Sequence, residues 1–408
     1  MAACARTLAS TAAILTLAAC QPADPVHPDP LAGGSPTPTN VLRVGVLHAT
    51  SGLFAGEGSA ANEGLRLALE GQNLTFGGKK LELVYEDTEG KPDLALAKVR
   101  KLVNSDRARL ILGPVSALEA AAVRDYVATW HVPTILSGPA DRTLTQERYS
   151  PYLFRVTGEY QANLAAGWYA AKRLNYRRAA VVLADTALGR EAAVTFRRAF
   201  EAAGGQVTGE VPMPLGAPDA GYYLAQVRGL QPQSDVTVAL GLSGSTAVRF
   251  LKGYADSGLK RQLPLLVSQD TVDETVVLPL VADVANGVVS FATWAATLDS
   301  PEQRVFVDAF RKKYAKEPSM ASTYGWVEGQ AALATIRAMD GHMDDPDAVA
   351  AALGRLNLPS PLGPITFDWR NQAIATIYVR KTEAANSVLS NTVIDTLQGV
   401  DQFWPGPR

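Results

Sequence analysis

The sequence has few of the side chains that bind metals or form disulfides. It contains two cysteines and four histidines among 408 residues. Serine, acid and base side chains also form no recognisable catalytic pattern. We therefore expect no metal ion, no cofactor and no enzymatic activity. The histidines lack the short spacings of metal ligands; they are His27, His48, His131 and His342.

An excess of charge of one sign is also missing. The 38 Lys and Arg residues nearly balance 40 Asp and Glu residues, for a formal net charge of −2. Charged residues make up 19% of the chain and hydrophobic residues 47%. This composition argues against disorder and against a surface for polyanions, so nucleic acid is not an expected partner. The length favours two domains, because one core rarely grows beyond about 250 residues.

Long apolar runs are absent after the first twenty residues. Residues 8–19 are uncharged and mostly apolar, follow Arg6, and are too few to span a bilayer, which is typical of an export signal. The run ends in Leu-Ala-Ala-Cys at 17–20. This ending resembles the lipobox of bacterial lipoproteins, whose cysteine is lipidated and becomes the mature N-terminus. The resemblance predicts a signal peptide over 1–19 and lipidation of Cys20.

The other cysteine, Cys4, lies in the segment that would be removed, so the mature chain would have one thiol and no disulfide. A short anchoring or buried helix with an incidental cysteine is the alternative. After Cys20, the stretch to residue 40 reads QPADPVHPDPLAGGSPTPTN, rich in proline, glycine and small polar residues. Such a chain stays extended and packs no core, so we predict that 20–40 tether the globular part to a membrane surface.

Short β-branched runs alternate with helical patterns from residue 42 onward. Strands separated by helices of about 10–15 residues predict right-handed crossovers and mostly parallel sheets with helices on both faces. Two such series predict two α/β lobes. The expected strands are 42–49, 80–87, 110–113 and 133–136, then 179–185, 206–211, 236–242 and 264–270, with helices near 59–72, 92–104, 189–203, 221–230 and 245–257 and one that starts at Ser116.

Further segments connect the two series. Residues 152–160 are extended and lead into a helix, and residues 287–294 are a comparable segment that leads out of the second series. A chain that crosses between lobes more than once makes a hinge of several strands, which permits rigid-body closure around a ligand. The remaining elements expected are helices near 301–315 and 320–339 and a β pair at 363–369 and 373–381.

Eight stretches in this order resemble one known family. They are VGVLHATSGLFAGEG (44–58), ELVYEDTEGKPDLALAKVRKLV (82–103), LILGPVSALEAAAV (110–123), VPTILSGPADRTLT (132–145), YLFRVTGEY (152–160), ALGREAAVTFRRAFEAAGGQV (187–207), SGLKRQLPLLVSQD (257–270) and LGPITFD (362–368). No single stretch is decisive, but the ordered set resembles the type I periplasmic binding proteins of the leucine/isoleucine/valine class, the solute receptors of bacterial ABC transporters.

The resemblance implies an α/β fold of two doubly wound lobes joined by a multi-strand hinge. It places the N-terminal lobe at 41–157 plus 292–364 and the C-terminal lobe at 158–291 plus 365–408. The implied function is that of an exported, lipid-anchored and monomeric receptor. It would bind a small polar solute of the amino acid, amide or carboxylate kind and deliver it to an ABC permease. A lipid-anchored sensor or envelope-assembly factor with the same fold is the alternative, because a fold does not settle a function.

Ser116 is the first candidate ligand residue. It follows a strand and opens an alanine-rich helix, and Glu119 completes a capping-box pattern. In open α/β sheets ligands bind beyond the carboxyl ends of the strands, where helix N-termini suit a carboxylate. We expect Ser116 both to cap the helix and to contact a ligand, with capping alone as the alternative.

The resemblance implies that the N-terminal lobe holds the ligand through the loops after its third and fourth strands. In these loops Ala117 replaces a usual second serine, and Asp141 replaces a usual threonine or serine. A carboxylate at 141 would repel a ligand carboxylate, and a turn or cap role is its alternative. Glu57 replaces a usual aromatic and is either a solvated helix-start acid or an acceptor for an ammonium. The candidates here are Glu57, Ser116, Ala117, Pro139, Ala140 and Asp141.

In the C-terminal lobe the resemblance implies contacts from the loops after the strands. Asp270 matches the place of the family's acid for a ligand ammonium, and an N-cap is its alternative role. Leu188 stands where an aromatic is often found, and Trp294 is either a cleft residue or a buried hinge aromatic. The candidates are Leu188, Ser243, Gln269, Asp270 and Trp294.

Two enzyme motifs are present only in loose form. GEGSAA at 56–61 fits a dinucleotide fingerprint, with Glu86 and Asp87 near the place of its ribose-binding acid, but seven residues separate it from the preceding strand. GLSGS at 241–245 lacks the closing glycine of a nucleophile elbow. Both motifs argue weakly for an enzyme.

Overall fold

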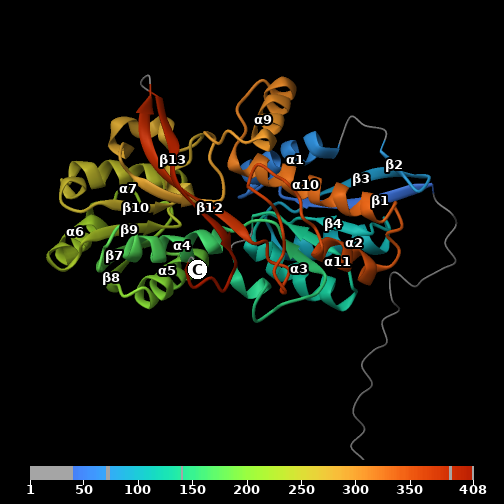
Figure 1. The fold of residues 1–408 in the computed structure, drawn as a ribbon, viewed down its shortest axis with the longest axis horizontal. Coiled ribbons are helices and arrows are strands. Elements are labelled where there is room, and N and C mark those ends of the chain that lie inside the picture. The colour runs from blue at the N-terminus through green and yellow to red at the C-terminus, as the bar shows by residue number, and fades with distance from the viewer. Residues whose placement is uncertain (1–39, 70–73, 139–140, 386–387, 407–408) are drawn as a thin grey trace, which may run out of the picture.

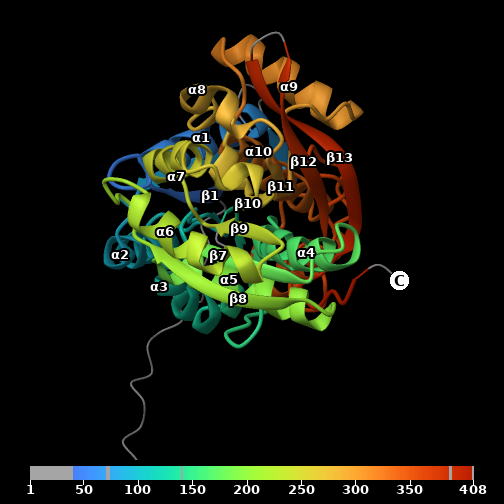
Figure 2. The same cartoon turned by 90° about the vertical axis from the view of Figure 1, so that its left-hand side faces the viewer.

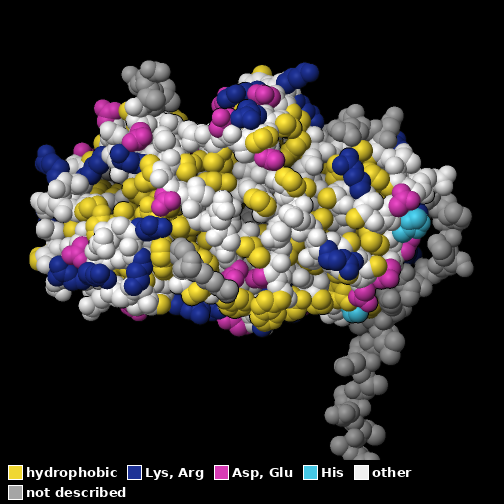
Figure 3. All heavy atoms as spheres, in the orientation of Figure 1, with side chains coloured by type: hydrophobic (Ala, Val, Ile, Leu, Met, Phe, Trp, Pro, Cys, Tyr) yellow, Lys and Arg dark blue, Asp and Glu magenta, His cyan; other side chains and the backbone are white. Residues whose placement is uncertain are grey.

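The computed structural model describes residues 40–69, 74–138, 141–385 and 388–406. Two α/β lobes lie side by side along the long axis, and each is built on its own sheet (Figure 1). The predicted fold class is therefore confirmed. Basic and acidic side chains are intermixed over the face drawn in Figure 3. The signal peptide, Cys20 and the tether lie outside the described residues. Within the described residues, no helix combines the length and hydropathy needed to cross a bilayer.

The first lobe has a six-stranded sheet in the order β2-β3-β1-β4-β5-β6. The strands are parallel except β2, which runs antiparallel to β3. The strands are β1 (Val41–His48), β2 (Thr75–Phe76), β3 (Lys79–Asp87), β4 (Leu110–Leu112), β5 (Thr134–Leu136) and β6 (Leu153–Arg155). The helices that cover them are α1 (Ala55–Leu69), α2 (Pro92–Asn104), α3 (Ala117–Thr129), α10 (Met320–Ala338) and α11 (Pro346–Gly354).

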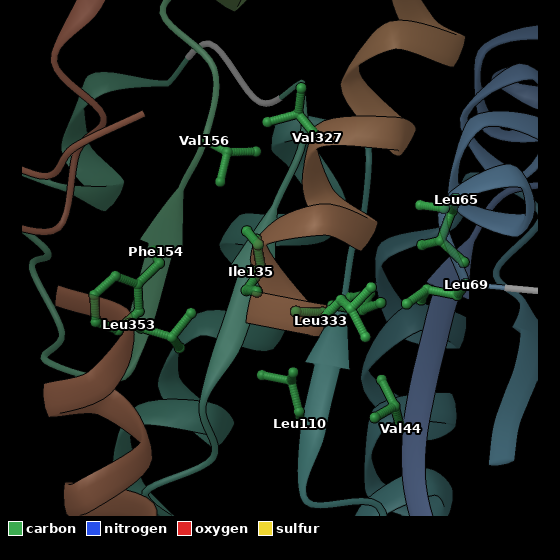
Figure 4. Packing of buried hydrophobic residues seen from close by; sticks show 14 of the residues in the cluster. Val44, Leu65, Leu69, Leu110, Ile135, Phe154, Val156, Val327, Leu333 and Leu353 are labelled. Carbon is green, nitrogen blue, oxygen red and sulfur yellow. The ribbon is translucent and has the colours of Figure 1, made fainter. Parts of the chain in front are cut away.

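Hydrophobic residues bury both faces of this sheet. Val44 and Leu110 pack against α1, α10 and α11 on one face (Figure 4). Leu47 and Ile111 pack against α2 and α3 on the other. The chain therefore returns from the second lobe to complete the core of the first.

The second lobe has a seven-stranded sheet in the order β13-β12-β11-β10-β9-β7-β8 (Figure 2). The five strands from β8 to β11 in this order are parallel, while β12 and β13 form an antiparallel hairpin at one edge. The strands are β7 (Arg178–Ala184), β8 (Gln206–Met213), β9 (Val236–Leu240), β10 (Leu265–Ser268), β11 (Val289–Ala292), β12 (Ala375–Ala385) and β13 (Val388–Val400). The helices of this half and of the connection that follows are α4 (Glu159–Lys172), α5 (Ala187–Ala202), α6 (Gly221–Leu230), α7 (Gly244–Asp256), α8 (Leu278–Val281) and α9 (Pro301–Tyr314).

The chain passes between the lobes after β6, after β11 and before β12. Two of these crossings are bonded to each other, because Arg155 pairs with Gln372 in a parallel bridge and Gln372 Nε2 donates to the Thr157 carbonyl at 2.6 Å. Gln161 Nε2 also donates to the Ala373 carbonyl at 2.8 Å. These bonds make a hinge of adjacent strands, which allows rotation but resists separation.

The last β pair predicted from the sequence is confirmed only in part, because 373–381 is found as β12 but 363–369 is not a strand. Residues 363–369 form only isolated bridges, through Ile365 and Phe367. The partner of β12 is β13, which lies at the sheet edge. We did not predict this strand because polar and apolar residues alternate along it. The predicted lobe limits stay a prediction, and the packing of Ile365 and Ala373 in the first lobe favours a final crossing near residue 374.

Candidate ligand-binding site

A buried polar network fixes two loops of the first lobe. The Glu328 carboxylate, fully buried on α10, accepts from the Gly113 N–H at 2.7 Å and from Ser137 Oγ at 2.9 Å. Its Oε2 also lies 3.2 Å from His48 Nε2, and His48 Nδ1 lies 2.8 Å from Asn62 Oδ1. The network therefore holds the carboxyl ends of β1, β4 and β5, from which the candidate loops begin.

Ser116 is the N-cap of α3. Its Oγ accepts from the Glu119 N–H at 3.3 Å and donates to Glu119 Oε2 at 2.5 Å, which confirms the predicted capping. Ser116 and Ala117 are both buried, at 6% and 7% exposure. Because the hydroxyl proton is used within the cap, backbone N–H groups of the first turn are the donors that a ligand would meet here.

Asp141 caps a short helix, which is the role given above as the alternative to ligand contact. Its Oδ1 accepts from the Thr143 N–H at 2.9 Å, where a short 3₁₀ helix begins (Arg142–Leu144). Its carbonyl accepts from Arg155 Nη1 at 2.7 Å, which ties the loop to β6. Pro139 and Ala140 lie outside the described residues.

Helix starts line the facing side of the second lobe. Thr186 caps α5 by accepting from the Gly189 N–H at 3.0 Å, and Leu188 in the first turn is 42% exposed. Ser243 precedes α7 in extended conformation without a side-chain cap bond, and it is half-buried. Two helix N-termini of this lobe therefore follow directly on strand ends.

Gln269 and Asp270 follow β10 and differ in surroundings. Gln269 is buried, and its Nε2 donates to the Tyr324 hydroxyl at 3.2 Å. The same hydroxyl lies 2.7 Å from Thr293 Oγ1, so Tyr324 contacts the residues that directly follow β10 and β11 of the second lobe. The Asp270 side chain is exposed to water.

Acidic side chains of both lobes influence one another near Asp270. Burial among the surrounding loops raises the pKa of Asp270 to about 7, and the carboxylates of Asp273, Glu159 and Glu57 raise it further while Arg380 opposes them. Since Asp270 still contacts water, solvent screening weakens these effects. Glu57, exposed in the first turn of α1, is thus close enough to Asp270 to act on it across the lobes.

A cavity of about 200 Å³ lies beside the hinge. Gln269 and Trp294 line it together with Arg380 of β12 and Met320 at the start of α10. Trp294 is 2% exposed and its Nε1 donates to Gln303 Oε1 at 2.9 Å, so it is a buried hinge aromatic that also lines a cavity.

The structure thus divides the sequence-derived candidates into groups. The charge of Glu57 acts on Asp270 and that of Asp141 acts on Glu191 of α5, while Gln269 and Trp294 share the hinge cavity. Sequence reasoning missed Tyr324 and Arg380. A charged residue inside the apolar run of β12 was the one signal for Arg380.

The dinucleotide motif does not form its expected turn. Residues 56–61 lie inside α1, where a phosphate-binding fingerprint would need a strand-to-helix loop. Among the described residues, no group of three or more His, Cys, Asp or Glu side chains is placed to hold a metal ion.

Two hinged α/β lobes with helix starts on facing rims define the class of two-lobed ligand-binding proteins. The chain belongs to the periplasmic binding protein family, whose model matches residues 41–387. This finding confirms the resemblance to the leucine/isoleucine/valine class.

Three similar proteins illustrate the range of the family. An ABC transporter substrate-binding protein from Sphaerobacter thermophilus has 34% identity and a TM-score of 0.85, with 88% of this chain and 99% of that chain covered. A solute binding protein of an ABC transporter from Rhodopseudomonas palustris HaA2, in complex with p-hydroxybenzoic acid, has 27% identity and a TM-score of 0.80, covering 89% and 98%. The Leu/Ile/Val-binding protein homolog 6 of Brucella melitensis is 27% identical over 352 residues, or 85% of this chain and 89% of the relative.

Proposed function

We propose that this protein is an exported, lipid-anchored receptor that binds a small polar solute between its lobes and delivers it to an ABC permease. Membership of the periplasmic binding protein family supports export and solute binding. The Leu-Ala-Ala-Cys ending at Cys20 supports the anchor. The single observation that carries the proposal is the pair of facing rims, with the starts of α3, α5 and α7 at strand ends on either side of a bonded hinge.

The solute carries an amine as well as a carboxylate. The start of α3 offers N–H groups and a positive dipole end to a carboxylate. Glu57, Glu159 and Asp270 supply negative charge around one end of the cleft, which favours an ammonium. An amino acid satisfies both ends, whereas p-hydroxybenzoic acid, bound by one relative, has no amine to place there.

Each residue of the proposed site is assigned a role. Ser116 and Ala117 present the start of α3, and Glu57 and Asp270 attract an ammonium. Asp141 and Leu188 shape opposite rims. The proposed ligand-binding residues are Glu57, Ser116, Ala117, Pro139, Ala140, Asp141, Leu188, Ser243, Gln269, Asp270 and Trp294.

Thermal unfolding with candidate solutes tests this proposal. A solute present at 100 times its dissociation constant should stabilise the fold by about 2.7 kcal/mol. A panel of amino acids and of hydroxybenzoates separates the two solute classes. The shift should shrink in Ser116→Ala and in Asp270→Asn, each compared with its own ligand-free protein because Ser116→Ala also loses about 1 kcal/mol of capping. Asp308→Asn, at an exposed site on α9, is the control.

Two results would contradict the receptor proposal. If no amino acid or hydroxybenzoate stabilises the protein, the alternative of a sensor or assembly factor that contacts a protein gains support. If Cys20→Ala partitions into detergent as the unaltered chain does, the lipid anchor is wrong.

A further inference from the structure

Gln269 and Trp294 of the proposed solute site also line the hinge cavity, but its other walls lie away from the rims that carry Leu188 and Ser243. In the second sheet, Leu188 and Ser243 follow β7 and β9, on one side of β10. The cavity is lined from the other side, by residues of β12 and β13 and by Trp294 and Ala296, which follow β11. The loop before α10 closes it from the first lobe through Pro318 and Met320. Both lobes therefore contribute walls.

Arg380, which lines this cavity, has an unused hydrogen-bond donor. The side chain is 1% exposed, and its Nε donates to Ser290 Oγ at 3.1 Å while Nη1 donates to the Trp294 carbonyl at 3.0 Å. Its buried Nη2 has no hydrogen-bond partner within the described part of the chain. A buried guanidinium N–H without an acceptor is destabilising. A carboxylate is the acceptor that matches a guanidinium best.

Unused acceptors lie on the same walls. Gln269 Oε1 is buried and lacks a donor among the described residues. Glu274 uses Oε1 to accept from the Asn391 N–H at 3.0 Å, and Asp273 uses Oδ1 for the turn that follows it. Glu317 on the opposite wall is bound by Arg311. Asp273, Glu274 and Glu317 therefore line the cavity with acidic side chains, whose negative charge suits an ammonium.

Apolar side chains complete the lining. Met320 and Leu389 are half-buried on opposite walls, and Trp294 is buried between them. A small aliphatic side chain would gain about 25 cal/mol for each Å² of apolar surface removed from water here.

We propose that the hinge cavity is a second ligand site, for a small aliphatic zwitterion with one carboxylate and one ammonium. Arg380 Nη2 receives the carboxylate, Gln269 Oε1 and Glu274 receive the ammonium, and Met320 and Leu389 contact the aliphatic part. Because its walls come from both lobes, occupancy favours one arrangement of the lobes and so couples to the solute site.

Native mass spectrometry with three probes of similar shape tests this site. The probes are L-leucine, 4-methylpentanoate, which lacks the amine, and 3-methylbutylamine, which lacks the carboxylate. L-Leucine should bind at the cavity at least tenfold more tightly than either partial probe. Ser390→Trp fills the cavity from β13 and should remove one bound L-leucine, while Thr396→Trp, exposed further along β13, should not.

The outcome separates this site from the solute site. In the Ser116→Ala/Asp270→Asn double variant, the L-leucine that Ser390→Trp displaces should still bind. If Ser390→Trp binds as many L-leucine molecules as the unaltered protein, the proposal is wrong, whatever the double variant shows. Equal binding of all three probes, or of none, overturns the zwitterion assignment. Arg380→Lys gives a second variant, in which the affinity for L-leucine should fall while that for 3-methylbutylamine stays.

Discussion

Arg142 Nε lies 2.7 Å from Glu191 Oε1, and the two residues belong to different lobes. Arg142 follows the Asp141 cap in the first lobe, and Glu191 lies on α5 of the second. The pair is about three-quarters buried, with side-chain exposures of 26% and 25%. Burial raises the pKa of Glu191, while the Arg142 charge lowers it. This contact stabilises the lobe arrangement seen in Figure 1.

Loss of this ion pair should open the lobes without unfolding either. In Arg142→Gln, we expect a larger radius of gyration in X-ray scattering of the ligand-free protein and solute release a few-fold faster. The effect on global stability should be below about 1 kcal/mol, as for other partly exposed pairs. Arg304→Gln breaks a pair with Asp299 at the surface and is the control. An unchanged radius and release rate would mean that the pair does not bridge the lobes in solution.

Asp270 should make the protein less stable as pH rises. Its pKa in the folded state is raised to about 7 from an ordinary value of 3.8. The folded state therefore binds the proton more tightly than the unfolded state, so the stabilisation is complete below about pH 4 and is lost as pH rises through about 7. The melting temperature should fall between pH 5 and 8 more steeply than in Asp270→Asn, by a modest amount because the side chain is exposed.

The neighbours of Asp270 provide the control for this pH effect. Glu57→Gln removes one repelling carboxylate and should shift the transition to lower pH, while Asp308→Asn should change nothing. Parallel pH profiles for the unaltered protein and Asp270→Asn would rule out the raised pKa. Solute binding should respond in the opposite sense, with affinity for an ammonium rising through pH 7 as Asp270 becomes charged.

The network around Glu328 should control the rigidity of the candidate loops. Glu328→Gln keeps the size of the side chain but sets an amide against Gly113, Ser137 or His48, so at least one buried bond is lost. We expect a loss of about 1–3 kcal/mol and faster hydrogen exchange at the Gly113 and Gly138 amides. Glu201→Gln, exposed near the end of α5, is the control. Unchanged exchange at both amides would show that the network does not hold the loops.

Local patterns in the sequence were sufficient for most of the fold. The helix predicted at 221–230 is found at Gly221–Leu230, and the cap of Ser116 on Glu119 was predicted from a spacing of three residues. Such signals act within one turn of chain. The edge strand β13 was missed because its exposed positions, such as Thr396, interrupt the apolar run.

Interactions between distant parts of the chain were beyond sequence reasoning. The contact of Tyr324 with Gln269, the Arg142–Glu191 pair and the position of Arg380 each depend on how two lobes meet. The hydrophobic periodicity of one lobe does not indicate which residues of the other lobe lie opposite it. Residue spacing therefore cannot identify such partners. Sequence patterns placed the candidate residues on loops at strand ends, while their grouping came from the structure.

The packing of α1 on α10 depends on the absence of a side chain at Gly325. A Cβ built there would lie 1.9 Å from the Ala61 carbonyl oxygen, which is far too close for any side chain. In Gly325→Ala the two helices must separate, and we expect a loss of about 1–3 kcal/mol or more, as for other overpacked cores. Gly229→Ala is the matched control, because a Cβ at that position in α6 meets nothing within 4 Å. It should stabilise by about 0.5–1 kcal/mol through helix propensity. Urea unfolding of both variants gives the comparison, and equal shifts of the two midpoints would contradict the close approach of these helices.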